Sequence, residues 1–378
     1  MRLYSFTVVL LLAIIISSGA LFVSDFFYFA KKITATILNI FNTEESVKIN
    51  KHLTVNPQKG IYSTIWSARS KKINDLIRLA DETEINAIII DVKDNGDYID
   101  DYIKNLVVEL HKKSVYAIAR IIVFQDGSQI KVHPDWYFKK GDGSLWQDNR
   151  GWYWMDPTNH EIWDYNIEIS KQAIDAGFDE LNFDYFRYPA FAKNEDVIFP
   201  PEGKIIVKNL IINDFAHYLT SELKKYDPGI TLSVDLFAYN MLSKDDLGIG
   251  QNFVELYDYF DYVSPMIYPS HYLSGNFGFE NPAEHPYEVV LGTIEKGKVQ
   301  LLEKSAVEVG TSTLAIVNPI FEKRLKKLRP WLQDFNIGAI YDGDMIRKEK
   351  QAVYDAGLTS GWLLWNPRNV YTEDALDK

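Results

Sequence analysis

The chain has 378 residues, of which 47% are hydrophobic and 24% are charged, and this balance excludes an intrinsically disordered protein. Its 40 Lys and Arg residues against 52 Asp and Glu give a net charge of -12. Because no Lys/Arg block is interleaved with aromatics either, nucleic acid is excluded as a partner. The absence of cysteine excludes disulfides, thiolate nucleophiles and cysteine-ligated metals.

The first predicted element is an apolar segment at the amino terminus, since Leu3 to Val23 is a run of 21 residues without a charge. A membrane-spanning helix needs about 20 apolar residues and a signal-peptide core about 7–15, so this length favours an uncleaved anchor. Small residues at Ser18-Gly19-Ala20 leave a cleaved signal peptide as the alternative. We therefore predict an anchor or signal over residues 1–30 and a linker over 31–59. The protein is then expected on the outer face of the cell membrane, or secreted if the segment is cleaved.

From residue 60 onward, short β-rich runs alternate with longer amphipathic runs. The predicted strands are 60–66, 87–93, 116–124, 180–188, 231–238, 262–268, 328–335 and 361–366. The predicted helices are 71–84, 98–113, 160–176, 205–225, 286–304 and 345–356, with a short one near 252–259. Gly177 and Gly357 are stop signals for two of them. Residues 309–320 also look like a strand, and if they join the sheet the seventh strand moves.

This alternation indicates an α/β protein with a parallel sheet and crossover helices. Eight such units predict a (β/α)8 TIM barrel over residues 60–378, preceded by the hydrophobic anchor helix. An open doubly wound sheet is the alternative, but no Gly-x-Gly-x-x-Gly turn follows the first strand.

The active site of such a barrel lies at the carboxyl ends of its strands. Because side chains alternate along a strand, Asn182 and Asp184 share one face of the fourth strand, and Ser233 and Asp235 share one face of the fifth. We expect these polar faces to point to the barrel axis. Two carboxylates from neighbouring strands are what cleavage of a glycosidic bond requires, so Asp184 and Asp235 are the predicted catalytic residues.

Other polar and aromatic residues near strand ends are predicted to bind the substrate. This set is Asp91, Lys93, Arg120, Arg187, Tyr268, Trp331, Gln333 and Trp365. Arg120 or Arg187 would keep one carboxylate ionised, although a structural ion pair is an equal alternative for Arg120. Asp91 and Lys93 share a face and could simply pair with each other. Asp94 and Asp334 better fit helix caps, and the Trp-rich stretch 136–154 fits a loop packed on itself.

Several longer motifs carry a family resemblance. They are Asp156-Pro157-Thr158-Asn159, Gly177-Phe178-Asp179-Glu180, Phe183-Asp184-Tyr185-Phe186-Arg187-Tyr188-Pro189, Pro330-Trp331-Leu332-Gln333-Asp334-Phe335 and Gly361-Trp362-Leu363-Leu364-Trp365-Asn366-Pro367. Over residues 60–370 the chain resembles a bacterial family of glycoside hydrolase-like barrels, domain of unknown function 4015, distantly similar to the α-amylase superfamily.

The resemblance implies that Asp184 matches the nucleophile position at the end of strand four. It also implies that Asp235 stands at the acid/base position of strand five, where the α-amylase relatives normally have Glu. Strand seven of those relatives brings a third carboxylate, whereas Gln333 is the inward residue here. The amylase mechanism is therefore not expected to transfer unchanged.

The leading hypothesis is a glycoside hydrolase that acts on an extracellular or cell-surface polysaccharide without a cofactor. The alternative is a non-catalytic glycan-binding barrel, favoured by the missing Glu and the missing third carboxylate. A metal-dependent hydrolase has little support, because the seven His form no His-x-x-x-His pair and only Asp91, Asp184 and Asp235 could supply oxygen ligands. The net negative charge disfavours a strongly anionic polymer as substrate.

Overall fold

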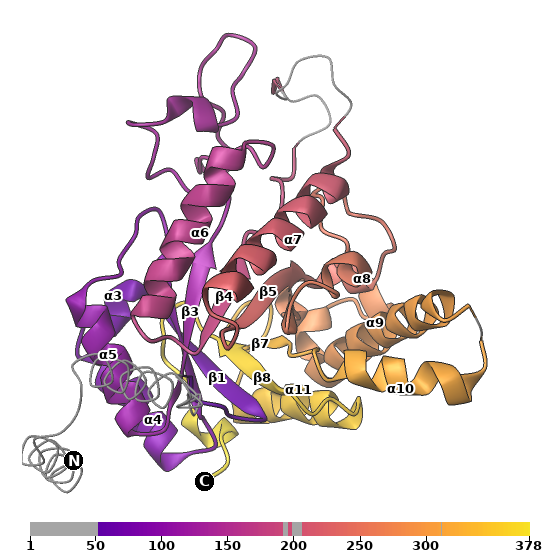
Figure 1. Cartoon of the computed structure of the whole chain (residues 1–378). Helices are drawn as coiled ribbons and strands as arrows, with labels where there is room; N and C mark the ends of the chain where they lie inside the picture. Colours follow the sequence, from indigo (N-terminus) through magenta and orange to yellow (C-terminus); the bar gives the residue numbers. More distant parts are fainter. Residues whose placement is uncertain (1–51, 192–195, 199–205, 311) are drawn as a thin grey trace, which may run out of the picture. The chain divides into compact units, whose positions relative to one another are not determined.

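Eight parallel strands close into a barrel in the computed structural model, which describes residues 52–191, 196–198, 206–310 and 312–378 (Figure 1). The strands are β1 Gln58–Ser63, β2 Ala87–Lys93, β3 Tyr116–Ile122, β4 Glu180–Asp184, β5 Thr231–Phe237, β6 Tyr262–Met266, β7 Trp331–Gln333 and β8 Gly361–Trp365. Each strand pairs with the next, and β8 returns to pair with β1. The closed barrel confirms the predicted fold and all eight predicted strands, and it rules out the open sheet.

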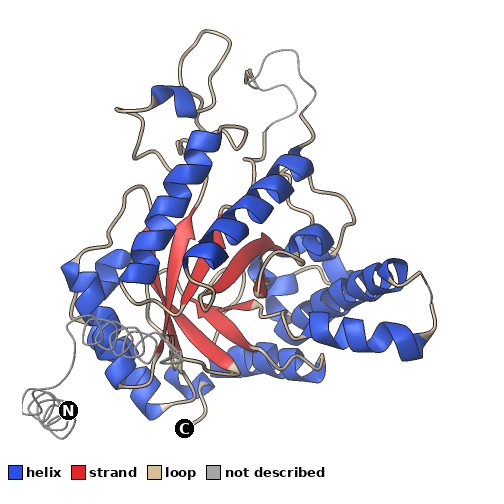
Figure 2. Cartoon of the chain, in the orientation of Figure 1, coloured by secondary structure: helices blue, strands red, loops and turns tan. Residues whose placement is uncertain are grey.

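Helices connect the strands and surround the sheet (Figure 2). They are α3 Ile65–Ala68, α4 Lys72–Glu82, α5 Asp101–Lys112, α6 His160–Asp175, α7 Lys208–Tyr226, α8 Phe253–Leu256, α9 Pro286–Glu308, α10 Leu314–Leu325 and α11 Gly343–Asp355. Short 3-10 turns are η1 Pro134–Trp136, η2 Ala238–Met241, η3 Pro269–His271, η4 Asn276–Gly278, η5 Pro282–Glu284 and η6 Glu373–Ala375. The predicted anchor over residues 1–30 lies outside the described residues. Among the helices that are described, none has the length and apolar character needed to cross a membrane.

Helix α5 illustrates why the helices form where they do. Ile103, Leu106, Val107 and Leu110 are spaced by three and four residues, so they form one apolar stripe, and all four are buried. The carboxylate of Asp100 accepts a hydrogen bond from the Ile103 amide at 3.1 Å and caps the helix. Sequence patterning and capping therefore fix the same helix.

The predicted helix-capping roles of Asp94 and Asp334 are wrong. Asp100 caps α5, and Asp342 caps α11 by accepting from the Met345 amide at 3.1 Å. The Asp334 carboxylate instead accepts the backbone N–H and the hydroxyl of Thr372, at 2.9 and 2.8 Å. Asp334 therefore ties β7 to the carboxyl-terminal segment of the chain.

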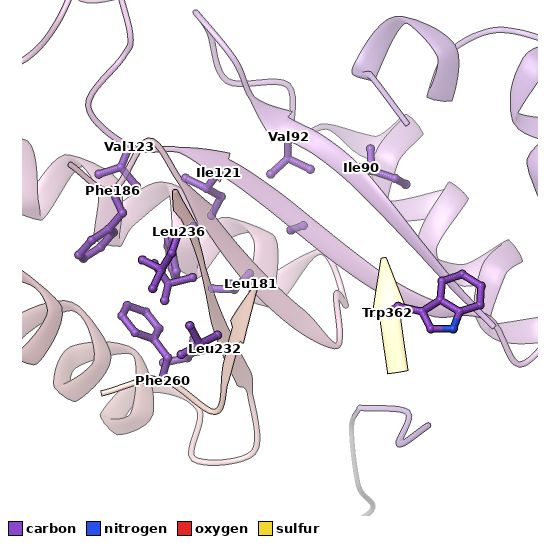
Figure 3. Packing of buried hydrophobic residues seen from close by; sticks show 14 of the residues in the cluster. Ile90, Val92, Ile121, Val123, Leu181, Phe186, Leu232, Leu236, Phe260 and Trp362 are labelled. Carbon is purple, nitrogen blue, oxygen red and sulfur yellow. The ribbon is translucent and has the colours of Figure 1, made fainter. Parts of the chain in front are cut away.

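The outward and inward faces of the sheet contribute to two separate apolar clusters. Leu232 and Leu236 of β5 point outward and pack with Phe186 and Phe260 in the layer between sheet and helices (Figure 3). Inside the barrel, a second cluster includes Ile89, Ile118 and Leu363 among its fully buried members. Burying a side chain of this size contributes about 1.5–3 kcal/mol to stability. The two clusters therefore fix which side chains of a strand point into the barrel and which point outward.

The amino-terminal end of the barrel is closed by residues that precede β1. Leu53 and Val55, which belong to the predicted linker, are partly buried against the interior cluster. The Leu53 amide donates to Asp179 Oδ1 at 2.7 Å, just before β4. This part of the predicted linker therefore packs against the barrel.

A buried ion pair lies inside the barrel. Arg329 and Glu180 are both completely buried and are joined by two hydrogen bonds, one of them from Arg329 Nη1 at 3.1 Å. Arg329 Nη1 also donates to Gln58 Oε1 at 2.7 Å, and the Ser233 hydroxyl donates to Glu180 Oε1 at 2.5 Å. Such pairs are tolerated only when further hydrogen bonds offset the cost of removing the charges from water.

Residues 309–320, which have the composition of a strand, belong mostly to a helix. Helix α9 ends at Glu308 and α10 begins at Leu314, so β7 stays where it was predicted (Figure 1). Arg324 of α10 is buried and donates from Nη1 to Ser305 Oγ of α9 at 2.8 Å. Packing of one helix on the other therefore outweighs the strand preference of the β-branched residues.

We predict that Gly361→Ala destabilises the barrel where it closes. Gly361 has a φ of +91°, and a Cβ atom there would lie 1.8 Å from the carbonyl oxygen of Gln58 in β1. Gly143→Ala is the matched control, because Gly143 also has a positive φ, +83°, but a Cβ there would meet no atom within 4 Å.

The control should lose about 1 kcal/mol of unfolding free energy, the cost of the left-handed backbone alone, and Gly361→Ala more than about 4 kcal/mol. Urea unfolding followed by tryptophan fluorescence measures both losses. Equal losses in the two variants would contradict a close β1–β8 contact.

Candidate active site

The polar faces of β4 and β5 point into the barrel, as the alternation of side chains predicted. Leu181 and Leu232 are completely buried in the outer cluster. On the opposite face, Asn182 Nδ2 donates to Ser233 Oγ at 3.0 Å and to Asp235 Oδ1 at 2.8 Å, and these bonds join the two strands. The strand geometry thus places Asp184 and Asp235 on neighbouring strand ends at the carboxyl end of the barrel.

One guanidinium, that of Arg120 on β3, connects three carboxylates at this end. Arg120 Nη1 donates to Asp91 Oδ1 at 2.5 Å, and Arg120 Nη2 forms a short hydrogen bond with Asp184 Oδ2. Arg120 Nε lies 3.8 Å from Asp235 Oδ2. Because four successive strands contribute these side chains, the predicted residues Asp91, Arg120, Asp184 and Asp235 form a single cluster.

The cluster holds three carboxyl groups but one cation, so the carboxyls differ in protonation. Burial, together with the negative charge of Asp184, raises the pKa of Asp235 to about 8, although Arg120 opposes the shift. Burial also raises the pKa of Asp91. Desolvation disfavours a charged guanidinium too, but Asp91 and Asp184 hold the pKa of Arg120 well above its ordinary value. Asp184 is thus hydrogen-bonded to a permanent cation, whereas the raised pKa of Asp235 favours its protonated form at neutral pH.

The hydrogen bonds of Asp235 indicate where its proton resides. Oδ1 accepts from Asn182 Nδ2 and, at 2.7 Å, from the indole N–H of Trp331. An indole nitrogen can only donate, so Oδ1 is an acceptor and the proton belongs on Oδ2. Oδ2 is the oxygen nearer to Arg120, 3.8 Å from its Nε.

The backbone turns sharply directly after Asp184. Tyr185 has a φ of +50°, a left-handed conformation that costs a residue with a side chain about 1–2 kcal/mol. In this conformation the Tyr185 amide donates to Asp184 Oδ1 at 2.6 Å. Both oxygens of Asp184 are therefore held, one by this amide and one by Arg120, and such local strain is typical of functional sites.

A line of hydrogen bonds connects the cluster with the buried ion pair deeper in the barrel. Glu180 accepts from Ser233, Ser233 accepts from Asn182, and Asn182 donates to Asp235. All four side chains are at most 1% exposed. These hydrogen bonds connect Asp235 to the fully buried Glu180–Arg329 ion pair and so fix its position.

Aromatic side chains from β6 to β8 form one side of the site. Tyr268 and Trp365 are stacked with ring centroids 5.2 Å apart, and Phe335 meets Trp365 edge-on at 5.0 Å. Burial raises the pKa of the Tyr268 hydroxyl, and the charges of Asp235 and Asp184 add to the shift, so this hydroxyl lies near the carboxylates. The predicted aromatic residues Tyr268, Trp331 and Trp365 thus gather beside the cluster.

Lys93 lies apart from the carboxylate cluster. Its ammonium is 2.8 Å from Asp126 Oδ2, both side chains are completely buried, and it also donates to the Ile122 carbonyl at 2.5 Å. The possible pairing of Lys93 with Asp91 is therefore wrong. The pairing of β2 with β3 shifts register between Asp91 and Lys93, which breaks the simple alternation on which that pairing rested.

Arg187 contacts aromatic rings and forms no ion pair with any described residue. Its guanidinium lies over the rings of Trp154 at 4.8 Å and Tyr185 at 5.3 Å, and Nη1 donates to the Tyr188 carbonyl at 2.9 Å. Burial lowers the pKa of Arg187. Of the two arginines predicted to hold a carboxylate, Arg120 is the one that does so.

Gln333 is completely buried, and its carboxamide is engaged by backbone groups. Nε2 donates to the Phe335 carbonyl at 2.9 Å, and Oε1 accepts from the Ser270 amide at 3.2 Å. Gln333 therefore joins the end of β7 to the segment that follows β6, beside the aromatic side of the site.

Two features of the site were not predicted from the sequence. The Tyr62 hydroxyl at the end of β1 donates to Asp91 Oδ2, and its ring lies 5.5 Å from the Arg120 guanidinium. Trp331 was predicted only to bind the substrate, whereas its N–H bonds to Asp235. The position of Tyr62 at the end of a strand could have predicted a role in the site. The direction of the Trp331 N–H could not be predicted from the sequence.

No group of three or more His, Cys, Asp or Glu side chains in the described part of the chain is arranged to hold a metal ion. At the point where Asp91, Asp184 and Asp235 meet, the Arg120 guanidinium supplies the positive charge.

A comparison with protein families identifies the family of the chain. A family model described as "Putative glycosyl hydrolase domain" matches residues 97–371, which confirms the resemblance found in the sequence. A search of curated proteins finds no match. A hypothetical protein from Ruminiclostridium thermocellum is 32% identical with a TM-score of 0.40, over 46% of this chain and 96% of that one.

Two glycosidases are also similar in structure. An α-galactosidase from Thermus thermophilus, solved with p-nitrophenyl α-D-galactopyranoside, is 13% identical with a TM-score of 0.49, over 85% of this chain and 60% of that one. An enzyme of family GH13_31 is 15% identical with a TM-score of 0.42, over 83% of this chain and 65% of that one. The chain thus spans less than two thirds of either glycosidase.

We predict that Asp235→Asn flattens the pH dependence of stability. In wild type, the folded state keeps a proton on Asp235 up to about pH 8, while the unfolded chain releases it near pH 4. The stability due to this group is therefore full below pH 4, and it falls by about 1 kcal/mol per pH unit between pH 5 and 7. Asn cannot ionise, so the variant should lack this loss.

Chemical unfolding at pH 5, 6, 7 and 8 measures the difference between the slopes of wild type and variant. Asp135→Asn, at an exposed position, is the control and should keep the wild-type slope. An unchanged slope in Asp235→Asn would mean that Asp235 is ionised in the folded protein.

Proposed function

The chain belongs to the family of the glycosyl hydrolase domain, and from that premise we propose that it hydrolyses a glycosidic bond of a polysaccharide outside the cell, with Asp184 and Asp235 as its catalytic pair. The observation that carries the proposal is that Asp184 and Asp235 lie on neighbouring strand ends beside one guanidinium, Asp184 hydrogen-bonded to Arg120 and Asp235 3.8 Å from its Nε. Asp184 pairs with Arg120, whereas burial and Asp184 raise the pKa of Asp235 to about 8. A carboxylate beside a carboxylic acid is the pair that glycosidic cleavage needs.

In the proposed reaction, Asp235 Oδ2 gives its proton to the leaving oxygen as the bond to the sugar carbon breaks. Asp184 either attacks that carbon or takes a proton from an attacking water. Arg120 and the Tyr185 amide hold the Asp184 carboxylate in position, and Trp331 and Asn182 hold Asp235. Tyr268 and Trp365 would offer flat surfaces to the sugar ring.

A non-catalytic glycan-binding barrel is the second candidate, and one observation favours it. Asp91, Asp184 and Asp235 all lie around one guanidinium, and they are 1%, 6% and 1% exposed. A buried network of this kind, in which three carboxyl groups surround one guanidinium, could serve only to hold the strand ends together. The Asp on β5, one methylene shorter than Glu, fits this candidate too.

We predict that the two catalytic variants respond differently to the leaving group. Asp184→Asn should lose more than about 10⁴-fold in kcat on every substrate, because it removes the group that attacks or activates water. Asp235→Asn should lose about 10²–10⁴-fold on a polysaccharide but little on a nitrophenyl glycoside, whose leaving group needs no proton. In wild type, kcat/KM should fall as the pH rises through about 8.

The measurements are initial rates of reducing-end release from polysaccharides and of nitrophenol release, with Asp135→Asn as the control. Full activity of Asp184→Asn would refute the assignment. Retention of a polysaccharide by all variants, with no cleavage by wild type, would establish the binding barrel instead.

The proposal includes a location and a domain division. Residues 1–30 would anchor the protein and 31–51 would form the linker, since residues 52–59 of the predicted linker belong to the barrel unit, and the barrel would face the outside of the cell. An anchored protein is expected to remain with membranes after washing in alkaline carbonate and to be cut by protease added to intact cells. Recovery in the medium would indicate a cleaved signal peptide, and recovery in a protease-protected soluble fraction would contradict the location.

A further inference from the structure

The exposed tryptophans of this chain lie on the side of the barrel that carries the proposed active site. All nine Trp residues are in the described part, and only Trp66 and Trp152 are exposed, at 68% and 44%. Trp66 lies in α3 directly after β1, and Trp152 lies in the connection between β3 and α6. Both segments follow the carboxyl ends of their strands. Exposing an indole forgoes the gain from burying it, so its repeated occurrence on this face points to a ligand.

Trp66 is mounted on a rigid support. Helix α3 is capped by Thr64, whose hydroxyl accepts from the Ser67 amide at 3.1 Å. The Thr64 amide donates in turn to Asn369 Oδ1 at 3.0 Å, in the segment after β8. The Tyr98 ring meets the Trp66 indole edge-on, with centroids 5.7 Å apart. The Tyr98 ring contacts the edge of the indole, and hydrogen bonds hold the helix that carries Trp66. Binding a ligand to the flat indole face therefore costs little side-chain entropy.

Polar groups border this surface. Arg69 Nη2 donates to the Tyr98 carbonyl at 2.9 Å and to Asp100 Oδ2 at 2.8 Å, and the guanidinium lies over the Tyr102 ring at 5.4 Å. In this ion pair the Arg69 and Asp100 side chains are 29% and 53% exposed, so both can still bond to a ligand. The indole N–H of Trp66 donates to no described residue. An apolar plane with donors and acceptors at its edge matches a sugar ring, which has an apolar face and hydroxyls around it.

We infer that Trp66, with Tyr98, Arg69 and Asp100, forms a stacking site for a sugar ring of the same glycan chain whose bond is cleaved near Arg120. The site lies after β1 and at the start of α5, whereas Asp184 and Asp235 lie on β4 and β5. A ligand that reaches both must extend beyond the sugar at the cleaved bond. The inference rests on the proposed function and adds to it that the substrate is a glycan chain with a further sugar bound on the β1 side of the site.

The test compares Trp66→Ala with wild type on a long and a short substrate. The long probe is whichever of starch, xylan, galactomannan and peptidoglycan best retains the Asp184→Asn protein. The short probe is a nitrophenyl monosaccharide. Trp66→Ala should raise KM for the long probe about tenfold with unchanged kcat, the size of effect expected for one lost aromatic contact. Kinetics on the short probe should not change, which also shows that the variant is folded.

Two variants serve as controls. Trp66→Tyr keeps a flat ring and should recover most of the affinity. Tyr226→Ala removes an equally large ring, 46% exposed at the end of α7 on the opposite side of the barrel, and should behave as wild type.

A binding measurement separates failure of this inference from failure of the proposed function. Affinity electrophoresis of Asp184→Asn with and without Trp66→Ala requires no cleavage. Weaker retention with Trp66→Ala supports the stacking site even if wild type cleaves nothing. Equal KM and equal retention for wild type and Trp66→Ala would overturn it. So would loss of binding to phosphatidylglycerol vesicles in Trp66→Ala with unchanged glycan affinity, since Trp66 would then contact a membrane.

Discussion

The arrangement at the carboxyl end of this barrel depends on one shared cation. Among the described residues, Arg120 is the one cation that pairs with Asp91, Asp184 and Asp235, because Lys93 pairs with Asp126 and Arg187 lies against aromatic rings. Three buried carboxyl groups around one positive charge cannot all ionise at reasonable cost. Asp235 is the carboxyl farthest from the guanidinium, 3.8 Å from Arg120 Nε, and burial together with Asp184 raises its pKa.

The scaffold below the cluster is polar where a barrel interior is usually apolar. The Glu180–Arg329 pair is completely buried, and its hydrogen bonds continue through Ser233 and Asn182 to Asp235. Burying an ion pair gives little net stability, but leaving either partner alone is expensive. The Glu180–Arg329 pair therefore restricts how β4 and β5 can lie against β7. This restriction keeps Asp235 at a constant distance from the Arg120 guanidinium.

The eight strands and the inward direction of Asp184 and Asp235 could be predicted from sequence, because both follow from local alternation of polar and apolar residues. Residues 309–320 could not, since their helical state comes from packing against α9. The partner of Lys93 was hidden for another reason. A register shift in β2 changes the direction of a side chain, and the residue types around Asp91 and Lys93 do not indicate this shift.

The Trp331 side chain has two roles, one in aromatic packing beside the site and one in the hydrogen bond to Asp235. The same indole packs in the interior cluster with Tyr268 and Phe335 and donates to the carboxyl whose proton the proposed reaction would use. A change at Trp331 that repacks this aromatic side would therefore also alter the acidity of Asp235. Aromatic packing and the acidity of Asp235 are thus coupled through Trp331, and only another donor to Oδ1 could separate them.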